Sequence, residues 1–583
     1  MEVKNLEVHF TSQSNIVKAV NNISFSINRG ETVGIVGESG SGKSVAALSI
    51  MQLLPNRVSQ IVGGQIIYHS NQRKAQDLLK LSNHQILEFR GSEIAMIFQE
   101  PMSSLNPVLT CGEQIVEAIL LHDEISLSNA EHLTLNLFKK VQLPDPKRVF
   151  HAYPHELSGG QKQRVMIAMA MSCKPSLLIA DEPTTALDVT VQKRILDLML
   201  QLKNKINASI IFITHDLDVV AEIADKVLVM YKGEIVESGT VEDIFKNPKH
   251  PYTKGLLACK PPLKNRLKRL PVIDDFMEVV LENGKATLKE KSTDFEQVIV
   301  KNRISTEEYN KRQKFLQSQT PILKVKNLST WFPSKKNWYG KTTEYVKAVN
   351  EVSFKVFKGE TLGLVGESGC GKTTLGRTIL RLIEANSGSV EFEGKSIFEL
   401  NEQELKAMRK DIQIIFQDPY SSLNPRKTIG EAILEPMIVH NILENNEQRK
   451  QRVYELLETV ALEKKHYNRY PHEFSGGQRQ RVSIARALAT NPKFIVCDES
   501  VSALDVSVQA TILNLLLSLR EKYGLTYIFI SHDLSVVKLM SDRVIVMKDG
   551  KIEEQGYAEQ IYHQPKSNYT KELINSIPKG LVK

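Results

Sequence analysis

Two short segments combine glycines, a lysine and a hydroxyl residue in an order typical of phosphate binding. GESGSGKS at residues 37–44 and GESGCGKT at residues 366–373 both fit the pattern GxxxxGK[ST]. The glycines let backbone N–H groups turn toward a phosphate, the lysine supplies a cation and the last hydroxyl can bind Mg²⁺. One match can be an ordinary glycine-rich turn, but two matches in register make that alternative negligible. The predicted nucleotide-binding residues of these loops are Gly37, Glu38, Ser39, Gly40, Ser41, Gly42, Lys43, Ser44, Gly366, Glu367, Ser368, Gly369, Cys370, Gly371, Lys372, Thr373 and Thr374.

Paired carboxylates end two apolar segments, LLIADE at Glu182 and FIVCDE at Glu499. Asp181 and Asp498 suit Mg²⁺, together with the hydroxyls of Ser44 and Thr373. The two glutamates come one residue later, where they could orient or deprotonate an attacking water. The alternative is that an acidic pair merely ends a strand.

A histidine follows two further apolar segments, SIIFITHD and TYIFISHD. A lone histidine at such a position is more often structural. Here both segments end at the same residue, so we predict that His215 and His532 sense the γ-phosphate of a nucleotide.

The elements that must position these residues follow from the apolar patterns. TVGIV precedes the first phosphate loop and SVAALSIMQLL follows it, which indicates a strand, a loop and a helix in succession. The segments that end in carboxylates or histidine are typical of strands buried on both faces, as in a parallel sheet. Because nucleotide sites lie at the carboxyl edge of such sheets, we expect all these side chains to meet there.

The sequence repeats itself once. KAVNNISF at Lys18 returns as KAVNEVSF at Lys347, and LSGGQKQRVMIAMA returns as FSGGQRQRVSIARA. Two copies of one α/β domain explain this best. We therefore predict a first domain at residues 1–262, a charged connector at residues 263–320 and a second domain at residues 321–583.

The connector matches neither copy, but its sequence contains local structure signals. Asn283 and Gly284 predict a hairpin turn, and Ser305 with Glu308 predicts a capping box at the start of a helix. The basic cluster Lys264, Arg266, Lys268 and Arg269 is interpreted as a solvated face.

Composition limits the remaining possibilities. The 583 residues carry a net charge of +8 spread over a long chain, which does not predict nucleic-acid binding. No run of 18 or more apolar residues and no signal peptide is visible, and the five cysteines are widely spaced, so we expect a chain that neither spans a membrane nor is secreted.

LSGGQ at residues 157–161 and FSGGQ at residues 474–478 resemble the signature motif of ABC ATPases. The resemblance covers both copies and implies two tandem P-loop ABC ATPase domains, each a RecA-like α/β core with an antiparallel β subdomain and a helical signature subdomain. It implies ATP and Mg²⁺ as ligands, with Gln99 and Gln417 at the metal, Asp188 and Asp505 as D-loop aspartates, and Phe10 and Phe332 as candidates for stacking on adenine. The implied signature residues are Ser158, Gly159, Gly160, Gln161, Ser475, Gly476, Gly477 and Gln478.

Two further segments narrow the resemblance. FQEPMSSLNP and FQDPYSSLNP, with the tails HPYT and SNYT, are similar to the oligopeptide, dipeptide and nickel importer subfamily. The chain departs from that subfamily by lacking a cysteine cluster near its carboxyl end, and from its own first half at Ser500 and Asn568.

The resemblance also implies how the copies work. Each ATP would lie between the phosphate loop of one cassette and the signature of the other, in an intramolecular dimer. Two transmembrane permease subunits and an extracytoplasmic solute-binding protein would complete a peptide importer, with this chain peripheral at the cytoplasmic face of the membrane and no nucleic acid expected. The alternative is a soluble tandem ABC ATPase acting on ribosomes or nucleic acid.

Overall fold

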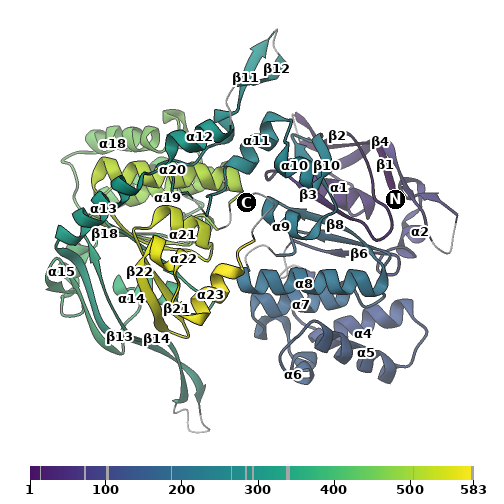
Figure 1. Cartoon of the computed structure of the whole chain (residues 1–583), viewed down its shortest axis with the longest axis horizontal. Helices are drawn as coiled ribbons and strands as arrows, with labels where there is room; N and C mark the ends of the chain where they lie inside the picture. The colour runs from purple at the N-terminus through teal and green to yellow at the C-terminus, as the bar shows by residue number, and fades with distance from the viewer. Residues whose placement is uncertain are drawn as a thin grey trace.

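A computed structural model describes residues 1–12, 15–70, 74–99, 104–184, 187–263, 265–282, 285–291, 295–336, 342–502 and 504–578. The two repeated halves, here called cassette 1 and cassette 2, lie side by side with the connector across one edge of both (Figure 1). Each half contains one mixed sheet, one antiparallel sheet and a group of helices. The structure therefore has the α/β architecture that the repeat predicts.

A six-stranded sheet forms the centre of cassette 1, in the order β10-β9-β3-β8-β7-β6. The strands β3, β8, β7 and β6 run parallel, and β10 closes one edge antiparallel to β9. Every residue of β3, β7 and β8 is buried, because each face of the sheet packs into its own hydrophobic cluster. The strands are β3 (Thr32–Val36), β6 (Ile94–Ile97), β7 (Leu177–Asp181), β8 (Ser209–Thr214), β9 (Lys226–Tyr231) and β10 (Glu234–Thr240).

Cassette 2 repeats this sheet in the order β18-β19-β20-β15-β21-β22. The strands are β15 (Thr361–Val365), β18 (Ile412–Ile415), β19 (Phe494–Asp498), β20 (Thr526–Ile530), β21 (Arg543–Lys548) and β22 (Lys551–Tyr557). In both sheets the strand before the phosphate loop neighbours the strand before the histidine, which neighbours the strand that ends in aspartate. The three predicted strand ends therefore share one edge.

A four-stranded antiparallel sheet accompanies each core, in the orders β2-β1-β4-β5 and β14-β13-β16-β17. Its strands are β1 (Glu2–Ser12), β2 (Asn15–Ser26), β4 (Ser59–Tyr68), β5 (Gln76–Asp77), β13 (Pro321–Lys336), β14 (Thr342–Phe357), β16 (Ser387–Phe392) and β17 (Lys395–Ser396).

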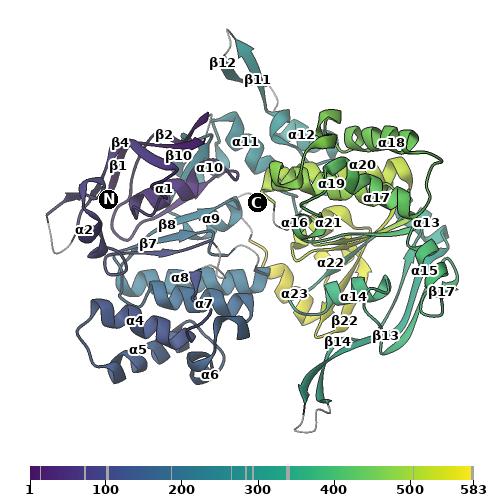
Figure 2. The same ribbon diagram turned by 180° about the vertical axis from the view of Figure 1, so that it is seen from behind.

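The helices of cassette 1 are α1 (Lys43–Ile50), α2 (Asn83–Leu87), α4 (Cys111–His122), α5 (Leu127–Lys140), α6 (Pro146–His151), α7 (Gly159–Ala170), α8 (Val189–Ile206), α9 (Leu217–Ile223), α10 (Val241–Lys246) and α11 (Pro251–Ala258). Those of cassette 2 are α14 (Lys372–Ile379), α15 (Glu402–Met408), α16 (Pro419–Ser422), α17 (Ile429–Val439), α18 (Asn446–Thr459), α19 (Gly476–Leu488), α20 (Val506–Tyr523), α21 (Leu534–Met540), α22 (Ala558–His563) and α23 (Asn568–Asn575). Helices α4 to α7 group together at one end of cassette 1, as Figure 2 shows from behind.

The connector contains the two local structures that its sequence predicts. Strands β11 (Met277–Glu282) and β12 (Lys285–Glu290) pair antiparallel; their predicted turn, Asn283 and Gly284, lies outside the described residues. Helix α12 (Phe295–Asn302) follows, and the Ser305–Glu308 capping box opens α13 (Thr306–Ser318). The hairpin projects away from both cassettes (Figures 1 and 2).

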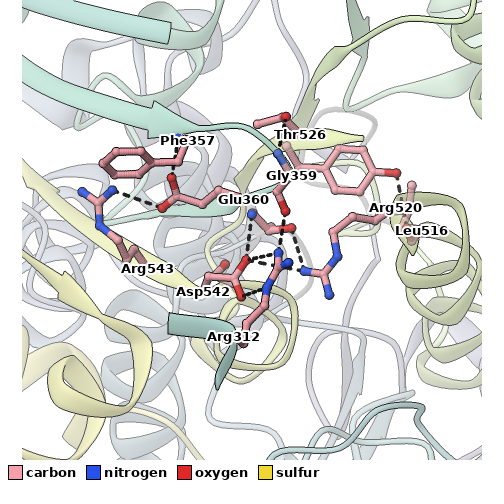
Figure 3. A network of polar contacts seen from close by, with 12 residues as sticks. Arg312, Phe357, Gly359, Glu360, Leu516, Arg520, Thr526, Asp542 and Arg543 are labelled. Carbon is pink, nitrogen blue, oxygen red and sulfur yellow. Dashed lines mark hydrogen bonds and ion pairs between the residues drawn. The ribbon is translucent and has the colours of Figure 1, made fainter. Parts of the chain in front are cut away.

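The connector is bound to both cassettes: Met277 joins the core of cassette 1, and other parts are held by cassette 2. Arg312 on α13 donates two hydrogen bonds to the Asp542 carboxylate, from Nε at 3.2 Å and Nη2 at 3.1 Å, in the network of Figure 3. Leu267 and Leu270 join the hydrophobic core of cassette 2. The prediction of a solvated basic cluster is wrong for Arg266, whose guanidinium donates to the Ser541 carbonyl at 2.7 Å and is 10% exposed.

Candidate functional site

Each phosphate loop joins a central strand to a helix, as its sequence predicts. Gly42 ends the first loop at φ 100°, and a Cβ there would collide with the Ala19 carbonyl, so only glycine fits. The buried Lys43 ammonium donates to the carbonyls of Gly37 and Glu38, both at 2.8 Å. Lys372 repeats these contacts in cassette 2. Burial lowers the pKa of Lys43, although the nearby carboxylates of Glu182 and Asp505 oppose this.

The predicted metal ligands meet in both cassettes. The Ser44 hydroxyl lies 3.0 Å from Asp181 Oδ1, and the Thr373 hydroxyl lies 2.8 Å from Asp498 Oδ1. Burial raises the pKa of Asp181 to about 6 and also raises that of Asp498. The second carboxylate oxygen of Asp498 is buried and accepts no hydrogen bond from the described residues. A cationic group, Arg377 Nη2, lies 3.8 Å from this oxygen.

Glutamate, histidine and glutamine converge beside each phosphate loop. In cassette 1, Glu182 contacts His215 Nδ1 at 3.5 Å and accepts a hydrogen bond from the Gln99 amide at 3.1 Å. In cassette 2, Glu499 lies 3.4 Å from His532 Nδ1 and 2.9 Å from the Gln417 amide nitrogen. The structure therefore brings together three residue types that come from three separate segments of each half.

These contacts shift the charge states of the histidines. Burial alone would lower the pKa of His215 and of His532, but the hydrogen bond and charge of the adjacent glutamate outweigh burial and raise both values. Burial acts to raise the pKa of Glu499, and His532 outweighs that effect and lowers it. In cassette 2 the pair therefore favours an ionised Glu499 beside a protonated His532.

The two cassettes contact each other through their phosphate loops. Ser507, at the start of α20, donates its hydroxyl to the Glu38 carboxylate of cassette 1. Thr190, at the equivalent position of α8, donates to Glu367 Oε1 of cassette 2 at 2.8 Å. Asp188 accepts the Ser368 backbone N–H at 3.2 Å. Each phosphate loop therefore meets the helix that follows the other cassette's D-loop, in a head-to-tail arrangement.

One pocket is lined by most of the predicted site residues of cassette 2. Phosphate-loop residues, Gln417, Glu499 and His532 line it, and Asp188 of cassette 1 completes one side.

The signature motifs lie next to these contacts. Ser158 caps α7 and Ser475 caps α19, each in a capping box with the glutamine three residues later. A Cβ on Gly160 would meet Val191, and one on Gly477 would meet Val508, the residues that follow Thr190 and Ser507. The signature helix thus packs on the element that reaches the opposite phosphate loop.

Phe10 and Phe332 lie on the antiparallel sheets. Phe10 packs against the core of cassette 1, and Phe332 is 40% exposed on β13. Their stacking on adenine stays a prediction.

Three residues that contact the site or its neighbouring segments were not predicted from the sequence. Tyr252 and Tyr569 bind the phosphate loops through their hydroxyls. Lys260 lies in the cavity between the two histidine segments and bridges Asp216 and Asp218. The recurrence of tyrosine in HPYT and SNYT was a signal that could have identified Tyr252 and Tyr569. Lys260 has no counterpart in cassette 2, so the repeat gave no signal for it.

Comparison with known proteins identifies the family of this chain. A family model described as ABC transporter matches residues 20–185 and 349–502, one segment in each cassette. A second, described as oligopeptide/dipeptide transporter, C-terminal region, matches residues 236–283 and 554–580. The chain belongs to the ABC transporter ATP-binding family and is an ATPase.

Its curated relatives are importer subunits. Glutathione import ATP-binding protein GsiA of Pectobacterium atrosepticum is 47% identical over 99% of this chain and 89% of the relative. The proteins of the same name from Shigella boydii and Escherichia coli are 48% identical over the same shares. The chain is thus an ATP-binding and hydrolysing subunit of the importer class, and the alternative of a ribosome or nucleic-acid ATPase finds no support.

Solved structures similar to this chain include a dimeric ATP-binding cassette in a post-hydrolysis state with ADP and Pi. It is 33% identical, covers 41% of this chain and 99% of its own, and has a TM-score of 0.37. Among the described residues, no helix is long and apolar enough to cross a membrane.

Proposed function

We propose that this chain powers the uptake of glutathione or a related small peptide. It would lie peripherally at the cytoplasmic face of the membrane, beneath two permease subunits that receive cargo from an extracytoplasmic solute-binding protein. The names of the relatives and the peptide-transporter segment in each cassette support this cargo class.

We further propose two composite ATP sites within one chain. Site one joins the phosphate loop of cassette 1 to the signature and D-loop of cassette 2, and site two reverses these roles. The observation that carries this proposal is the pair of equivalent contacts, Ser507 to Glu38 and Thr190 to Glu367. Helix α13 ends just before β13, which favours domain limits of 1–262, 263–320 and 321–583.

The site residues have distinct roles in hydrolysis. Lys43 and Lys372 hold the β- and γ-phosphates. Glu182 and Glu499 orient the attacking water and take its proton, and each is held in place by the neighbouring histidine and glutamine. Because the γ-phosphate bridges two cassettes, ATP favours the closed dimer and its hydrolysis loosens it.

The paired oxygens also fit Mg²⁺. Neighbouring oxygen ligands of an octahedral Mg²⁺ lie about 3 Å apart. The Ser44–Asp181 and Thr373–Asp498 oxygens are 3.0 Å and 2.8 Å apart. We propose that these pairs, with Gln99 and Gln417, hold the ion, which when bound neutralises phosphate charge.

Reconstitution tests the proposed function. The tagged chain should recover two polytopic permeases from detergent-solubilised membranes, identified by mass spectrometry. Proteoliposomes with these permeases and the solute-binding protein should take up labelled glutathione only with ATP, and a chain carrying Glu182→Gln and Glu499→Gln should not support uptake. Recovery of ribosomes without a permease would overturn the proposal, whereas uptake of another solute would overturn the cargo.

A further inference from the structure

A tyrosine from the tail of each cassette reaches the back of its own phosphate loop. The Tyr252 hydroxyl accepts the Glu38 backbone N–H at 3.0 Å, and the Tyr569 hydroxyl accepts the Glu367 N–H at 3.1 Å. Tyr252 is fully buried and Tyr569 is 6% exposed. Water is therefore a poor substitute for either hydroxyl, and the loop amide depends on the tyrosine for its hydrogen bond.

The tails fix these tyrosines in the same way in both cassettes. His250 caps α11 by accepting the Tyr252 N–H through its side chain, and Ser567 caps α23 by accepting the Tyr569 N–H. The change from HPYT to SNYT therefore keeps a capping side chain two residues before the tyrosine.

A glutamate anchors each tail to the sheet edge. Glu237 on β10 accepts the backbone N–H groups of Lys249 and His250, at 2.7 and 3.0 Å. Glu554 on β22 accepts those of Lys566 and Ser567, at 2.9 and 3.0 Å. Each tyrosine therefore belongs to a segment that is hydrogen-bonded to the edge of the central sheet.

The glutamate of the phosphate loop is the point where three contacts meet. The N–H of Glu38 binds Tyr252, its carbonyl accepts the Lys43 ammonium, and its carboxylate accepts the Ser507 hydroxyl of the other cassette. Glu367 makes the same three contacts with Tyr569, Lys372 and Thr190. A shift of this one residue would disturb both the phosphate-binding lysine and the contact between cassettes.

We propose that Tyr252 and Tyr569 are positioning residues for ATP hydrolysis, which hold Glu38 and Glu367 where each meets the hydroxyl of the opposite cassette. The inference rests on the proposed ATP sites and assigns a role to the peptide-transporter tail. Each tyrosine acts on one site: Tyr252 on site one and Tyr569 on site two.

Single and paired variants of the full chain test this assignment through the ATPase KM and kcat. Tyr252→Phe keeps the ring and removes the hydroxyl, so we expect the KM for ATP to rise about 5- to 30-fold, with a smaller change in kcat. Ser507→Ala should act on the same contact, so the Tyr252→Phe/Ser507→Ala pair should fall short of the product of the single effects by about threefold or more.

The second cassette supplies the matched control. Tyr252→Phe combined with Thr190→Val should give the product of the single effects, because Thr190 contacts the other loop. Tyr569→Phe should show the reverse pattern, non-additive with Thr190→Val and additive with Ser507→Ala. Tyr527→Phe removes another buried tyrosine hydroxyl, 3.3 Å from the Leu516 carbonyl, and should leave the KM unchanged.

The proposal is overturned if the effects multiply in every double variant. It is also overturned if Tyr252→Phe is equally non-additive with Ser507→Ala and with Thr190→Val, because either pattern indicates only a loss of packing. Thermal unfolding of each variant shows whether it is folded, and the Tyr569 series decides the matter if Tyr252→Phe does not fold. Unchanged hydrolysis in the Glu182→Gln/Glu499→Gln chain would instead show that the proposed ATP sites are wrong, independently of the tyrosine variants.

Discussion

At the scale of single residues, the two candidate catalytic glutamates have a backbone conformation that side chains rarely adopt. Glu182 has φ 47° and Glu499 has φ 46°, in the left-handed region, which costs about 1–2 kcal/mol for a residue with a Cβ. The next strand fixes this conformation, since the Glu182 N–H donates to the Ile213 carbonyl and the Glu499 N–H donates to the Ile530 carbonyl. In this conformation each carboxylate lies beside its histidine.

Replacing both glutamates by glutamine should separate binding from hydrolysis. We expect turnover to fall by about 10²- to 10⁴-fold, because the amide cannot take the proton of the attacking water. ATP binding, measured by equilibrium titration, should stay intact. Glu393→Gln is a matched control, since Glu393 also has a left-handed φ, 46°, but pairs with Lys493 away from the site. Unchanged turnover in the double variant would refute the assignment.

The histidine pairs predict a pH dependence of stability. The folded-state pKa of His532 is raised above 6.5, so its contribution is complete below 6.5 and is lost as the pH rises through the folded value. The pKa of Glu499 is lowered below 4.5, so its contribution is present above 4.5 and is lost as the pH falls through the folded value. The Tm difference between the wild-type chain and His532→Gln should therefore be largest between pH 4.5 and 6.5.

His440 provides the control with the opposite sign. Burial lowers its pKa, so protonation of His440 disfavours the folded state. His440→Gln should accordingly raise the relative Tm as the pH falls. A His532→Gln effect that is constant with pH would contradict the proposed pairing.

At the scale of elements, the two histidine segments are held differently. The aspartate after each histidine, Asp216 or Asp533, is the N-cap residue of helix α9 or α21. In cassette 1, Lys260 beyond α11 binds Asp216 Oδ1 at 2.9 Å and Asp218 Oδ2 at 2.6 Å. In cassette 2, Ile577 replaces Lys260 and Ser535 replaces Asp218. The two histidine segments are therefore held by different contacts.

Lys260→Met should destabilise cassette 1 more than an equivalent change destabilises cassette 2. Two poorly solvated aspartates would lose their cation, and we expect the free energy of unfolding to fall by about 2–4 kcal/mol, as for a largely buried pair. Ile577→Met keeps an apolar side chain of similar size and should cost less than about 1.5 kcal/mol. Denaturant unfolding measures both, and equal losses would show that Lys260 carries no ionic role.

At the scale of the whole molecule, the connector is packed on the cassettes rather than a free tether, and cassette 2 holds its helix α13. Asp542 and Asp225 occupy equivalent positions, and each accepts the N–H of a threonine at the start of a central strand. The Asp542 side chain is 5% exposed and the Asp225 side chain is 58% exposed. Arg312 and Arg266 of the connector lie over Asp542 and not over Asp225. Figure 3 shows Arg312 and Arg520 pointing toward the Asp542 carboxylate.

Arg312→Met should release this part of the connector. We expect a loss of about 1–2 kcal/mol, since the arginine is 31% exposed, and faster proteolysis and amide exchange in α12 and α13. Arg312→Lys should restore only part of the effect, because lysine lacks the paired donors of a guanidinium. Lys311→Met, on the exposed side of the same helix, should behave as the wild type. Unchanged exchange in Arg312→Met would show that other contacts hold the connector.

The sequence by itself determined the chemistry of this protein and its division into two copies. Phosphate loops, carboxylate pairs and histidines can be recognised because each depends on a strand, a turn and a few neighbouring residues, all of which are local in the chain. The same locality explains why the Ser305 capping box and the connector hairpin were predicted.

Tertiary structure alone decided the contacts between distant segments. Ser507 meets Glu38, Tyr252 supports the same loop, and Arg266 binds Ser541 instead of facing water. These pairs are far apart in sequence, and only the packing of whole elements brings them within hydrogen-bond distance. A basic residue in a charged segment looks solvated until the fold places a carboxylate and a carbonyl beside it, which is why that prediction failed.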